Sequence, residues 1–367
     1  MKIICNKSDL LKGINISLKA IPVRTTMAIL ECILIDASED EITFTTNDME
    51  LGIETRVKGE IVERGKIALD AKFLADIVRK LPDSEVTIET DGDYMASIIC
   101  EKSKFLIPGK SGEDFSYLPY IERDKSIVLS QFELKELIRQ TIFSIGDNEN
   151  NKIMTGELFE VSGDILKVVS LDKFRVSIRK HKLDREYDNV KVIVPGKTLN
   201  EISKILTGEA DRQVDVYFSS NHILFEFDET IVLSRLIEGE YFKIDQMISK
   251  DFNTSIKVNR KELLDCIDRA TLFYSEGNKK PVVFNIEDGS LKINIVSTTG
   301  KMNEDIDIDK EGNNLTIGLN PKYLIEALRV IDDENVSIFF MRAQEPCTIK
   351  DDEGKYIYLI LPVNYTA

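Results

Sequence analysis

The residues that could support catalysis or bind a metal are few in this sequence. Its only histidines are His181, which stands between two lysines and is typical of a solvated surface, and His222, which lies in a predicted turn. The five cysteines never occur in CxxC spacing: Cys5, Cys32, Cys100, Cys266 and Cys347. A zinc site needs clustered Cys and His ligands, so we expect no metal and no cofactor. Scattered thiols favour a reducing cytoplasm.

Motifs for nucleotide binding and hydrolysis are also absent. The chain has no GxxxxGK(S/T), no GxGxxG after a predicted strand, no HExxH and no GxSxG. Two acidic runs could suggest metal-binding carboxylates, Asp91-Gly92-Asp93 and Asp305–Asp309. The first is typical of a turn, and the second alternates along the exposed face of a strand. A metal-dependent phosphodiesterase needs acids that converge beside a basic surface, so this function is the weakest hypothesis.

The chemistry that the sequence does favour is phosphate binding by basic side chains at a fixed spacing. A ten-residue pattern occurs at 72–81, 197–206 and 322–331, at intervals of 125 residues. Positions three, six and ten are apolar in every copy, and about 100° per residue places them on one face of a helix. Positions one and eight fall near the opposite face and are always basic: Lys72, Arg79, Lys197, Lys204, Lys322 and Arg329. An ordinary solvated helix face would explain the basic residues of a single copy. It explains less well why all six of these positions are basic in a chain of net charge −16.

The charge of the whole chain is segregated in the same way. Six predicted helical windows hold 15 Lys and Arg against 9 Asp and Glu: 7–20, 71–81, 131–142, 196–206, 259–272 and 321–330. Their net charge of +6 leaves −22 on the remainder. This distribution permits a local surface for a polyanion on an otherwise acidic protein.

The repeat predicts three domains, at 1–122, 123–250 and 251–367, because 367 residues exceed one ordinary core. Predicted hairpin turns recur with it, starting at Ser38, Ser162 and Glu287. Each domain is an α+β unit of two helices and seven or eight mostly antiparallel strands, with the helices on one face of the sheets. No apolar run approaches the ~20 residues of a membrane span, and the N-terminus lacks a signal-peptide pattern.

Several short motifs keep their order and spacing over the whole chain. They are Met1–Ile3 with Asp9–Leu11, Val23–Leu30, Glu113–Pro119, Thr155–Glu160, Ser170–Arg175, Val192–Lys197 and Leu361–Val363. In this arrangement the sequence resembles the bacterial DNA polymerase III beta subunit, the replicative sliding clamp. The resemblance implies a non-catalytic, head-to-tail homodimer that closes into a ring around duplex DNA, with helices inside and sheets outside. It implies as partners a clamp-loader ATPase, the replicative polymerase and other proteins that carry a clamp-binding peptide, all in the bacterial cytoplasm.

The resemblance also implies which residues face DNA. The family uses a basic residue in the loop after the first helix, here Arg24, a loop near Asn150, and cations of the inner helices. The expected contacts are Lys7, Lys12, Arg24, Lys72, Arg79, Lys80, Asn151, Lys152, Lys197, Lys204, Lys322 and Arg329. For Arg24 the alternative is an ordinary surface arginine.

A groove for partner peptides is implied between the second and third domains. The matching positions are Met154, Leu171, Lys173, Phe174, Arg175, Val176, Phe242, Gln246, Met247, Gln344, Pro346, Leu359, Leu361, Pro362, Val363 and Asn364. The alternative is that Leu359, Leu361 and Val363 simply complete the last strand, although Pro362 ends ladder pairing there. The sequence departs from the family pattern at three places. Phe174-Arg175 stands where family members often have His-Arg, and Phe242–Ile244 stands where they often have Pro-Asp-Tyr. The tail Asn364–Ala367 lacks the Arg that is common there.

The implied contact between protomers joins Lys104, Phe105 and Ile107 to Leu272, Glu304 and Asp305 of the other copy. A core role for Phe105 and Ile107 is the alternative. Three functions therefore remain: a DNA-encircling clamp, a peptide-binding scaffold that never touches DNA, and the phosphodiesterase.

Overall fold

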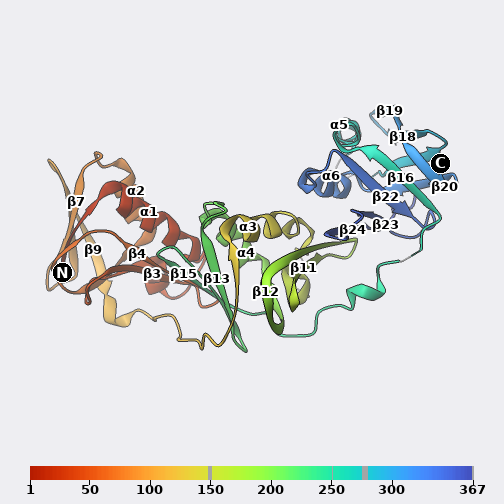
Figure 1. Ribbon diagram of the computed structural model, residues 1–367. Coiled ribbons are helices and arrows are strands. Elements are labelled where there is room, and N and C mark those ends of the chain that lie inside the picture. Colours follow the sequence, from red (N-terminus) through yellow and green to blue (C-terminus); the bar gives the residue numbers. More distant parts are fainter. Residues whose placement is uncertain (148–150, 250, 275–279, 366–367) are drawn as a thin grey trace. The chain divides into compact units, whose positions relative to one another are not determined.

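The computed structural model describes residues 1–147, 151–249, 251–274 and 280–365, and all six expected helices occur within it (Figure 1). They are α1 (Lys7–Ser17), α2 (Ala71–Lys80), α3 (Gln131–Arg139), α4 (Gly196–Ile205), α5 (Arg260–Ala270) and α6 (Pro321–Val330). Short 3₁₀ turns extend α1, α3 and α5: η1 (Leu18–Ala20), η4 (Ile142–Ser144) and η7 (Thr271–Phe273). The repeat seen in the sequence is thus a repeat of helix pairs. No helix in the described ranges has both the length and the apolar character to cross a membrane.

Side-chain caps begin two of the helices that carry the ten-residue pattern. The Asp70 carboxylate accepts a hydrogen bond from the Phe73 amide at 2.7 Å at the start of α2. Asn320 accepts from the Lys322 amide at 3.0 Å at the start of α6, where Pro321 takes the first position. Both caps satisfy amides that have no partner within a helix, so the start of each pattern is set locally.

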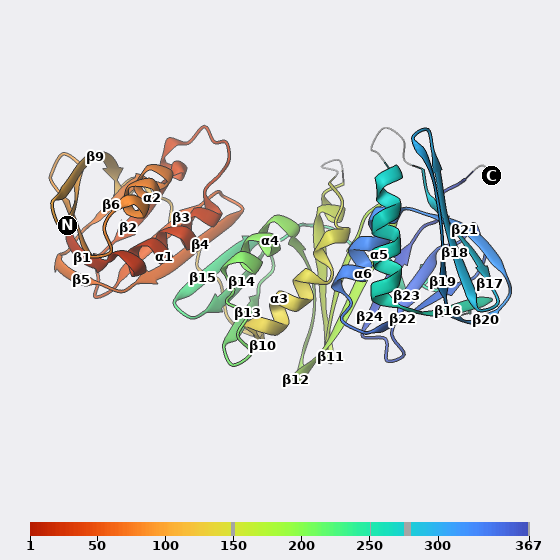
Figure 2. The same cartoon turned by 90° about the horizontal axis from the view of Figure 1, so that it is seen from above.

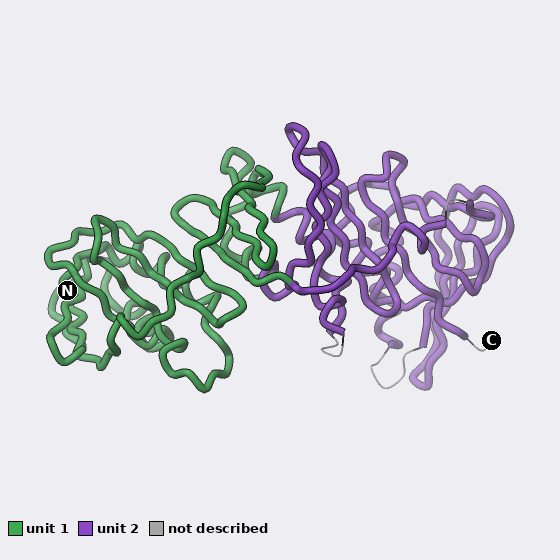
Figure 3. Tube along the Cα trace, turned by 90° about the horizontal axis from the view of Figure 1, so that it is seen from below, with its two compact units in different colours: residues 1–134, 200–236 green, residues 135–199, 237–367 purple. Residues whose placement is uncertain are grey.

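The chain divides into two compact units (Figure 3). Unit 1 consists of residues 1–134 and 200–236, and unit 2 of residues 135–199 and 237–367. The division falls inside α3 and α4, so the second sequence repeat contributes to both units.

Unit 1 contains one antiparallel sheet of 13 strands. In sheet order these are β10 (Lys125–Ser130), β13 (Gln213–Phe218), β14 (His222–Phe227), β15 (Thr230–Arg235), β4 (Leu51–Val57), β3 (Ile42–Asn47), β2 (Cys32–Asp36), β6 (Lys66–Asp70), β9 (Ser103–Ser111), β8 (Met95–Cys100), β7 (Glu85–Thr90), β1 (Lys2–Asn6) and β5 (Glu60–Glu63). Residues Ala28–Glu31 form the 3₁₀ turn η2 directly before β2.

The described residues of unit 2 form two antiparallel sheets. One is ordered β11 (Gly156–Leu171), β12 (Arg175–Pro195), β24 (Tyr356–Ile360), β23 (Cys347–Lys350), β22 (Asn335–Phe340), β16 (Thr254–Asn259) and β20 (Asp309–Gly312). The other is ordered β19 (Gly300–Asp307), β18 (Ser290–Ser297), β17 (Val282–Glu287) and β21 (Leu315–Leu319).

Two of the three predicted hairpin turns join paired strands. Residues 38–40 connect β2 to β3, and Asp288-Gly289 connects β17 to β18, with Gly289 at a φ of 73°. The predicted hairpin turn at Ser162 was wrong. There β11 continues alongside β12, with register shifts on both sides of Gly163, whose φ is 61°.

The pattern helices bury the residues that the periodicity assigned to the core. Leu74, Leu199 and Leu324 are fully buried at position three of their copies, whereas all six cations at positions one and eight are exposed. Helices α1 and α2 pack together over the first core, and α5 and α6 over the third (Figure 2). The sequence repeat therefore specifies which face of each helix meets a sheet.

Main-chain pairing joins each sequence repeat to the next. In unit 1, β4 of the first repeat pairs with β15 of the second, and the hydroxyls of Thr55 and Thr230 lie 2.8 Å apart across this junction. In unit 2, β12 of the second repeat pairs with β24 of the third, from Arg175 opposite Ile360 to Arg179 opposite Tyr356. Because the second repeat shares a sheet with each neighbour, its strands are distributed between the two units.

Glu157, the second residue of β11, is the one buried side chain of the described residues whose polar atoms lack a hydrogen-bond partner. The neighbouring Thr141 hydroxyl donates instead to the Leu137 carbonyl at 2.7 Å. Desolvation raises the pKa of the Glu157 carboxyl to about 8, so it is mainly protonated at neutral pH. No sequence pattern predicted that the Glu157 carboxyl would be buried without a hydrogen-bond partner, since Glu157 lies in an ordinary predicted strand.

We expect Leu324→Ala to lower the free energy of unfolding by about 2–5 kcal/mol, because it removes a fully buried side chain and leaves a cavity. Lys322→Ala on the same helix is the control and changes the unfolding free energy by less than about 0.5 kcal/mol. Urea unfolding followed by circular dichroism measures both. Equal destabilisation by the two variants would contradict the assignment of the buried face.

We expect the stability of the protein to fall with rising pH through Glu157. A free glutamate titrates at about 4.3, and the folded state holds this proton up to a pKa of about 8. Between these values, rising pH costs the folded state up to about 1.4 kcal/mol per pH unit. Glu157→Gln lacks this dependence and is more stable than the wild type at pH 8, as measured by urea unfolding at pH 5 to 8.5. Glu160→Gln, on the half-buried face of the same strand, is the control.

Candidate functional site

The six cations of the pattern helices are exposed, but they differ in their ion pairing. At position eight, Arg79 pairs with Asp76 at 2.9 Å, and Lys204 with Glu201 at 2.7 Å. Arg329 likewise lies 3.2 Å from Asp268 of α5. At position one, Lys72 and Lys322 have no ion pair within the described residues, and Lys197 is exposed. Exposed pairs are worth about 0–1 kcal/mol, so a phosphate can compete for any of these side chains.

The remaining predicted DNA-facing residues differ in exposure. Lys12, Arg24, Lys80 and Lys152 are exposed, and Asn151 is half-buried at the start of η5 (Lys152–Thr155); Asn150 lies outside the described residues. The Lys7 ammonium is half-buried and donates to the Leu81 carbonyl just after α2. A cation at the C-terminal end of a helix interacts favourably with the helix dipole. Lys7 therefore contributes to the packing of α1 against α2 as well as to the charge of the surface.

Five of the predicted peptide-binding residues form an apolar cluster in unit 2. This cluster, the exposed predicted residues and the tail residues Leu361–Val363 are together called the docking surface. Leu171, Val176 and Leu359 are buried in one cluster, and Met154 and Phe242 pack against it partly exposed. Six further predicted residues are exposed: Lys173, Phe174, Gln246, Met247, Gln344 and Asn364. A combination of apolar side chains with exposed polar and flexible apolar ones is typical of a protein-docking site.

Arg175 lies under this surface rather than on it, with only 8% of the residue exposed. Its guanidinium pairs with Asp172 at 3.0 Å and with Glu326 of α6, and donates to the Phe143 carbonyl. It also lies 4.4 Å from the centre of the Tyr323 ring. The side chain is therefore a link between the start of β12 and α6, because its charge needs these partners once it is buried.

Sequence reasoning missed Tyr323 and Glu326. The Tyr323 ring stacks with the exposed Phe174 ring at 6.3 Å between centroids, which makes it part of the docking surface. Its position in the repeat could have suggested this, since it directly follows the cation Lys322 and lies outside the apolar face.

The tail after β24 forms part of the docking surface and is held by backbone hydrogen bonds on both sides of Pro362. The Leu361 amide donates to the Phe174 carbonyl, and the Val363 amide to the Gly318 carbonyl of β21, each at 2.8 Å. Leu359 is a buried residue of β24, as expected if it simply completes the last strand. Leu361, Pro362 and Val363 lie beyond the strand and are half-buried, as is the predicted Pro346.

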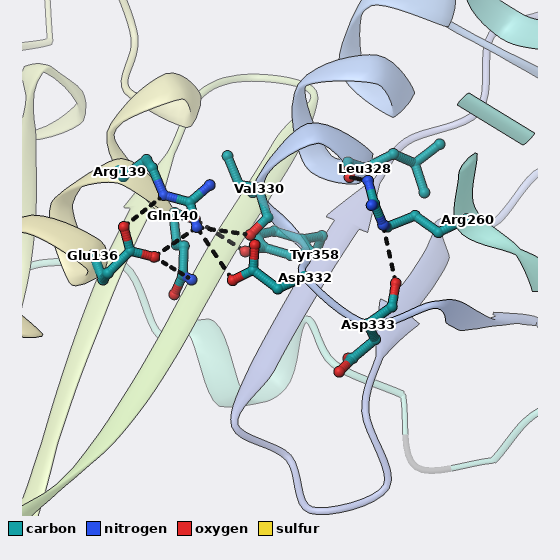
Figure 4. Close-up of polar contacts among 9 residues, drawn as sticks. All are labelled: Glu136, Arg139, Gln140, Arg260, Leu328, Val330, Asp332, Asp333 and Tyr358. Carbon is teal, nitrogen blue, oxygen red and sulfur yellow. Dashed lines mark hydrogen bonds and ion pairs between the residues drawn. The ribbon is translucent and has the colours of Figure 1, made fainter. Parts of the chain in front are cut away.

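A second polar link in unit 2 joins the end of α3 to the turn after α6 (Figure 4). Arg139 donates to both oxygens of Glu136 at 2.8 and 2.6 Å, and its NH2 group lies 3.3 Å from Asp332. These hydrogen bonds raise the pKa of the Arg139 guanidinium, chiefly through Glu136. The buried Tyr358 hydroxyl donates to the Gln140 carbonyl at 3.1 Å. Together with Arg175, these contacts hold α6 against the second repeat.

A polar cleft of about 560 Å³ lies beside this link. Its walls include Asp332, Asp333, Lys350, Lys355 and Tyr356. None of the predicted site residues lines it, and within the described residues no group of three or more His, Cys, Asp or Glu could hold a metal ion.

Five of the six predicted protomer-contact residues lie on two strands with a free edge, β9 and β19. Residues 103–108 of β9 pair only with β8, and β19 pairs only with β18, within the described residues. Phe105 is 38% exposed, whereas Ile107 belongs to the core of unit 1, which fits the alternative for Ile107. Leu106, which the sequence analysis missed, is 61% exposed.

On the other side of the predicted contact, Leu272 follows α5 and is 80% exposed. Glu304 is bound by Arg269 through two contacts of 2.7 and 2.6 Å, which hold the pKa of this carboxyl below its usual range. Asp305 and Lys104 are exposed.

Comparisons with known proteins agree over the whole chain. Family models of the DNA polymerase III beta subunit match residues 1–119 (N-terminal domain), 128–243 (central domain) and 245–364 (C-terminal domain). The beta sliding clamps of Bacillus subtilis and Staphylococcus epidermidis are 35% and 33% identical to this chain, with 99% of each chain covered.

Solved structures show the same similarity. A putative DNA polymerase III beta subunit from Eubacterium rectale matches with a TM-score of 0.98 at 64% identity. The DNA polymerase sliding clamp of Bacillus subtilis matches with a TM-score of 0.97 at 34% identity, and both cover 100% of each chain. The three tandem repeats of helix pairs and antiparallel sheets are thus three clamp domains, and this chain belongs to the DNA polymerase III beta-subunit family, the sliding clamps.

Proposed function

We propose that two copies of this chain close into a ring around duplex DNA and tether the replicative polymerase to it, without catalysis of their own. The observation that carries the proposal is the exposure of all six cations at positions one and eight of three helices in a family of sliding clamps. The chain acts in the bacterial cytoplasm and is placed on DNA by a clamp-loader ATPase. Its domains are residues 1–122, 123–250 and 251–367.

The DNA side of the proposal rests on charge rather than on base contacts. Lysine and arginine side chains bind phosphates without reading sequence, and weak contacts suffice when a closed ring prevents escape. Three of the six pattern cations already have a carboxylate nearby, so a phosphate that binds one of these three replaces an ion pair. The bound DNA therefore exchanges contacts at little cost, which suits sliding.

The free edges of β9 and β19 indicate how copies join. The strands β4, β12 and β19 occupy corresponding places in the three repeats. They follow the turns after β3, after the second half of β11 and after β18, respectively. β15, β24 and β9 correspond likewise, and the residues in the turns before β15 and β9, Asp228 and Glu101, share φ values of 49° and 48°. β4 pairs with β15 and β12 with β24, which leaves β19 and β9 for pairing between two copies. Such a heterologous contact closes into a ring after two copies.

Charge and exposed apolar side chains support the same contact. Lys104 on β9 would face the acidic Glu304 and Asp305 of β19. Phe73, at the position of α2 that Tyr323 occupies in α6, is 52% exposed. Since Tyr323 packs against the preceding repeat, we assign Phe73 the equivalent contact with Leu272 of a second copy.

The docking surface is assigned to short partner peptides that contain Gln and Leu or Phe. Its apolar cluster at Leu171, Val176 and Leu359 would receive the apolar side chains. The exposed Gln246 and Gln344 supply polar contacts at the rim. Phe174 in place of a frequent histidine makes this rim more apolar.

We expect the protein, after loading, to stay on closed circular DNA and to leave the same DNA once it is cut, as followed by gel filtration. Reversing Arg24, Lys72 and Lys197 to Glu should weaken salt-resistant retention without unfolding the protein. For each phosphate that a variant no longer neutralises, the slope of log affinity against log salt falls in magnitude by about 0.9.

The control variant reverses the exposed lysines Lys58, Lys125 and Lys182 instead. Retention that is equal on linear and circular DNA would contradict encirclement, and no retention at all would favour a peptide-binding scaffold. Cleavage of labelled DNA in Mg²⁺ or Mn²⁺ would favour the phosphodiesterase.

We expect Leu106→Asp to convert the dimer into monomers at micromolar concentration, because it places a charge in an apolar contact. Sedimentation velocity measures the change. Val62→Asp, at a similarly exposed apolar residue of β5, is the control and remains dimeric. A wild-type monomer, or a dimeric Leu106→Asp variant, would contradict the pairing of β9 with β19.

A further inference from the structure

The free edge of β21 is occupied by the end of the chain. β21 pairs with β17 on one side, and on its other side the Val363 amide donates to the Gly318 carbonyl at 2.8 Å. The Tyr365 hydroxyl reaches the Thr316 carbonyl at 3.4 Å. The tail therefore covers a sheet edge and connects it to the loop that carries Phe174.

Gly318 has no side chain where the tail approaches most closely. A Cβ at this position would lie 2.6 Å from the Val363 carbonyl oxygen and 2.8 Å from the Tyr365 ring. Its third neighbour, Pro281, would lie at an ordinary contact distance of 3.4 Å. Gly318 is buried in β21, and its φ lies outside the left-handed region. The backbone conformation and the buried position of Gly318 are both compatible with alanine. The close contact with the tail is therefore what excludes a Cβ at this position.

The tail residues between the two anchors belong to the docking surface. Pro362 has no amide to donate, and its neighbours Leu361 and Val363 are bound to Phe174 and Gly318. The position of Pro362 is thus set from both ends. A surface held in place before a ligand arrives binds more tightly, because binding then costs less conformational entropy.

We propose that Gly318 is a positioning residue for partner docking: it lets the tail lie flat on β21, and this contact, completed by the Tyr365 ring, holds Pro362 and Val363 in the peptide-binding arrangement. The proposal rests on the proposed docking function. The occupant of the surface is a Gln- and Leu/Phe-containing peptide, and the tail acts as a strap beside it.

The test compares Gly318→Ala with Gly92→Ala, whose Cβ would meet nothing within 4 Å. The first readout is the rate at which carboxypeptidase Y releases residues from the tail. The second is the affinity for a fluorescein-labelled peptide carrying Gln, Leu and Phe, measured by anisotropy. We expect Gly318→Ala to be digested faster and to bind the peptide about tenfold more weakly, with an unchanged dimer and unfolding midpoint. Gly92→Ala should match the wild type in both.

Tyr365 provides a second pair of variants. Tyr365→Ala should resemble Gly318→Ala, whereas Tyr365→Phe, which keeps the ring, should restore wild-type digestion and affinity. The proposal would be overturned if Gly318→Ala had the same digestion rate and the same peptide affinity as the wild type. If the wild type itself does not bind the peptide, the docking function fails, while digestion rates still decide whether Gly318 anchors the tail.

Discussion

Main-chain pairing between successive repeats is the constraint on which the rest of the structure depends. A clamp domain leaves a strand edge at each end, and an edge with unpaired amides and carbonyls must be covered or paired. Within the chain β4 pairs with β15 and β12 with β24, so each junction is a continuous sheet. This explains why the second repeat divides between two compact units. It also leaves one edge at each end of the repeat series, at β9 and β19.

Side-chain contacts in unit 2 reinforce its junction and determine what remains exposed. Arg175 joins β12 to Glu326 and Tyr323 of α6, and Arg139 joins α3 to Asp332. A buried guanidinium needs several partners, so residues that serve the junction are withdrawn from the surface. The docking surface consists of what these links leave accessible, including Phe174 and the tail.

Charge segregation follows from how the helices bury their apolar faces. Each pattern helix packs position three into a core, and its cations at positions one and eight are therefore exposed. The nearby carboxylates at Asp76, Glu201 and Asp268 moderate that charge without removing it. A chain of net charge −16 can in this way hold DNA locally while most of its surface repels it.

The sequence by itself determined the elements that depend on local periodicity. The six helices, their buried leucines and their exposed cations follow from a pattern that each segment carries alone, and composition argued against a metal site. The tertiary structure alone decided which residues lie beneath the surface and which edges pair. The burial of Arg175 and Ile107, the unpartnered carboxyl of Glu157 and the tail resting on Gly318 all arise from segments far apart in the chain. Periodicity is a property of neighbours in sequence, whereas burial and close approach depend on partners that only folding brings together.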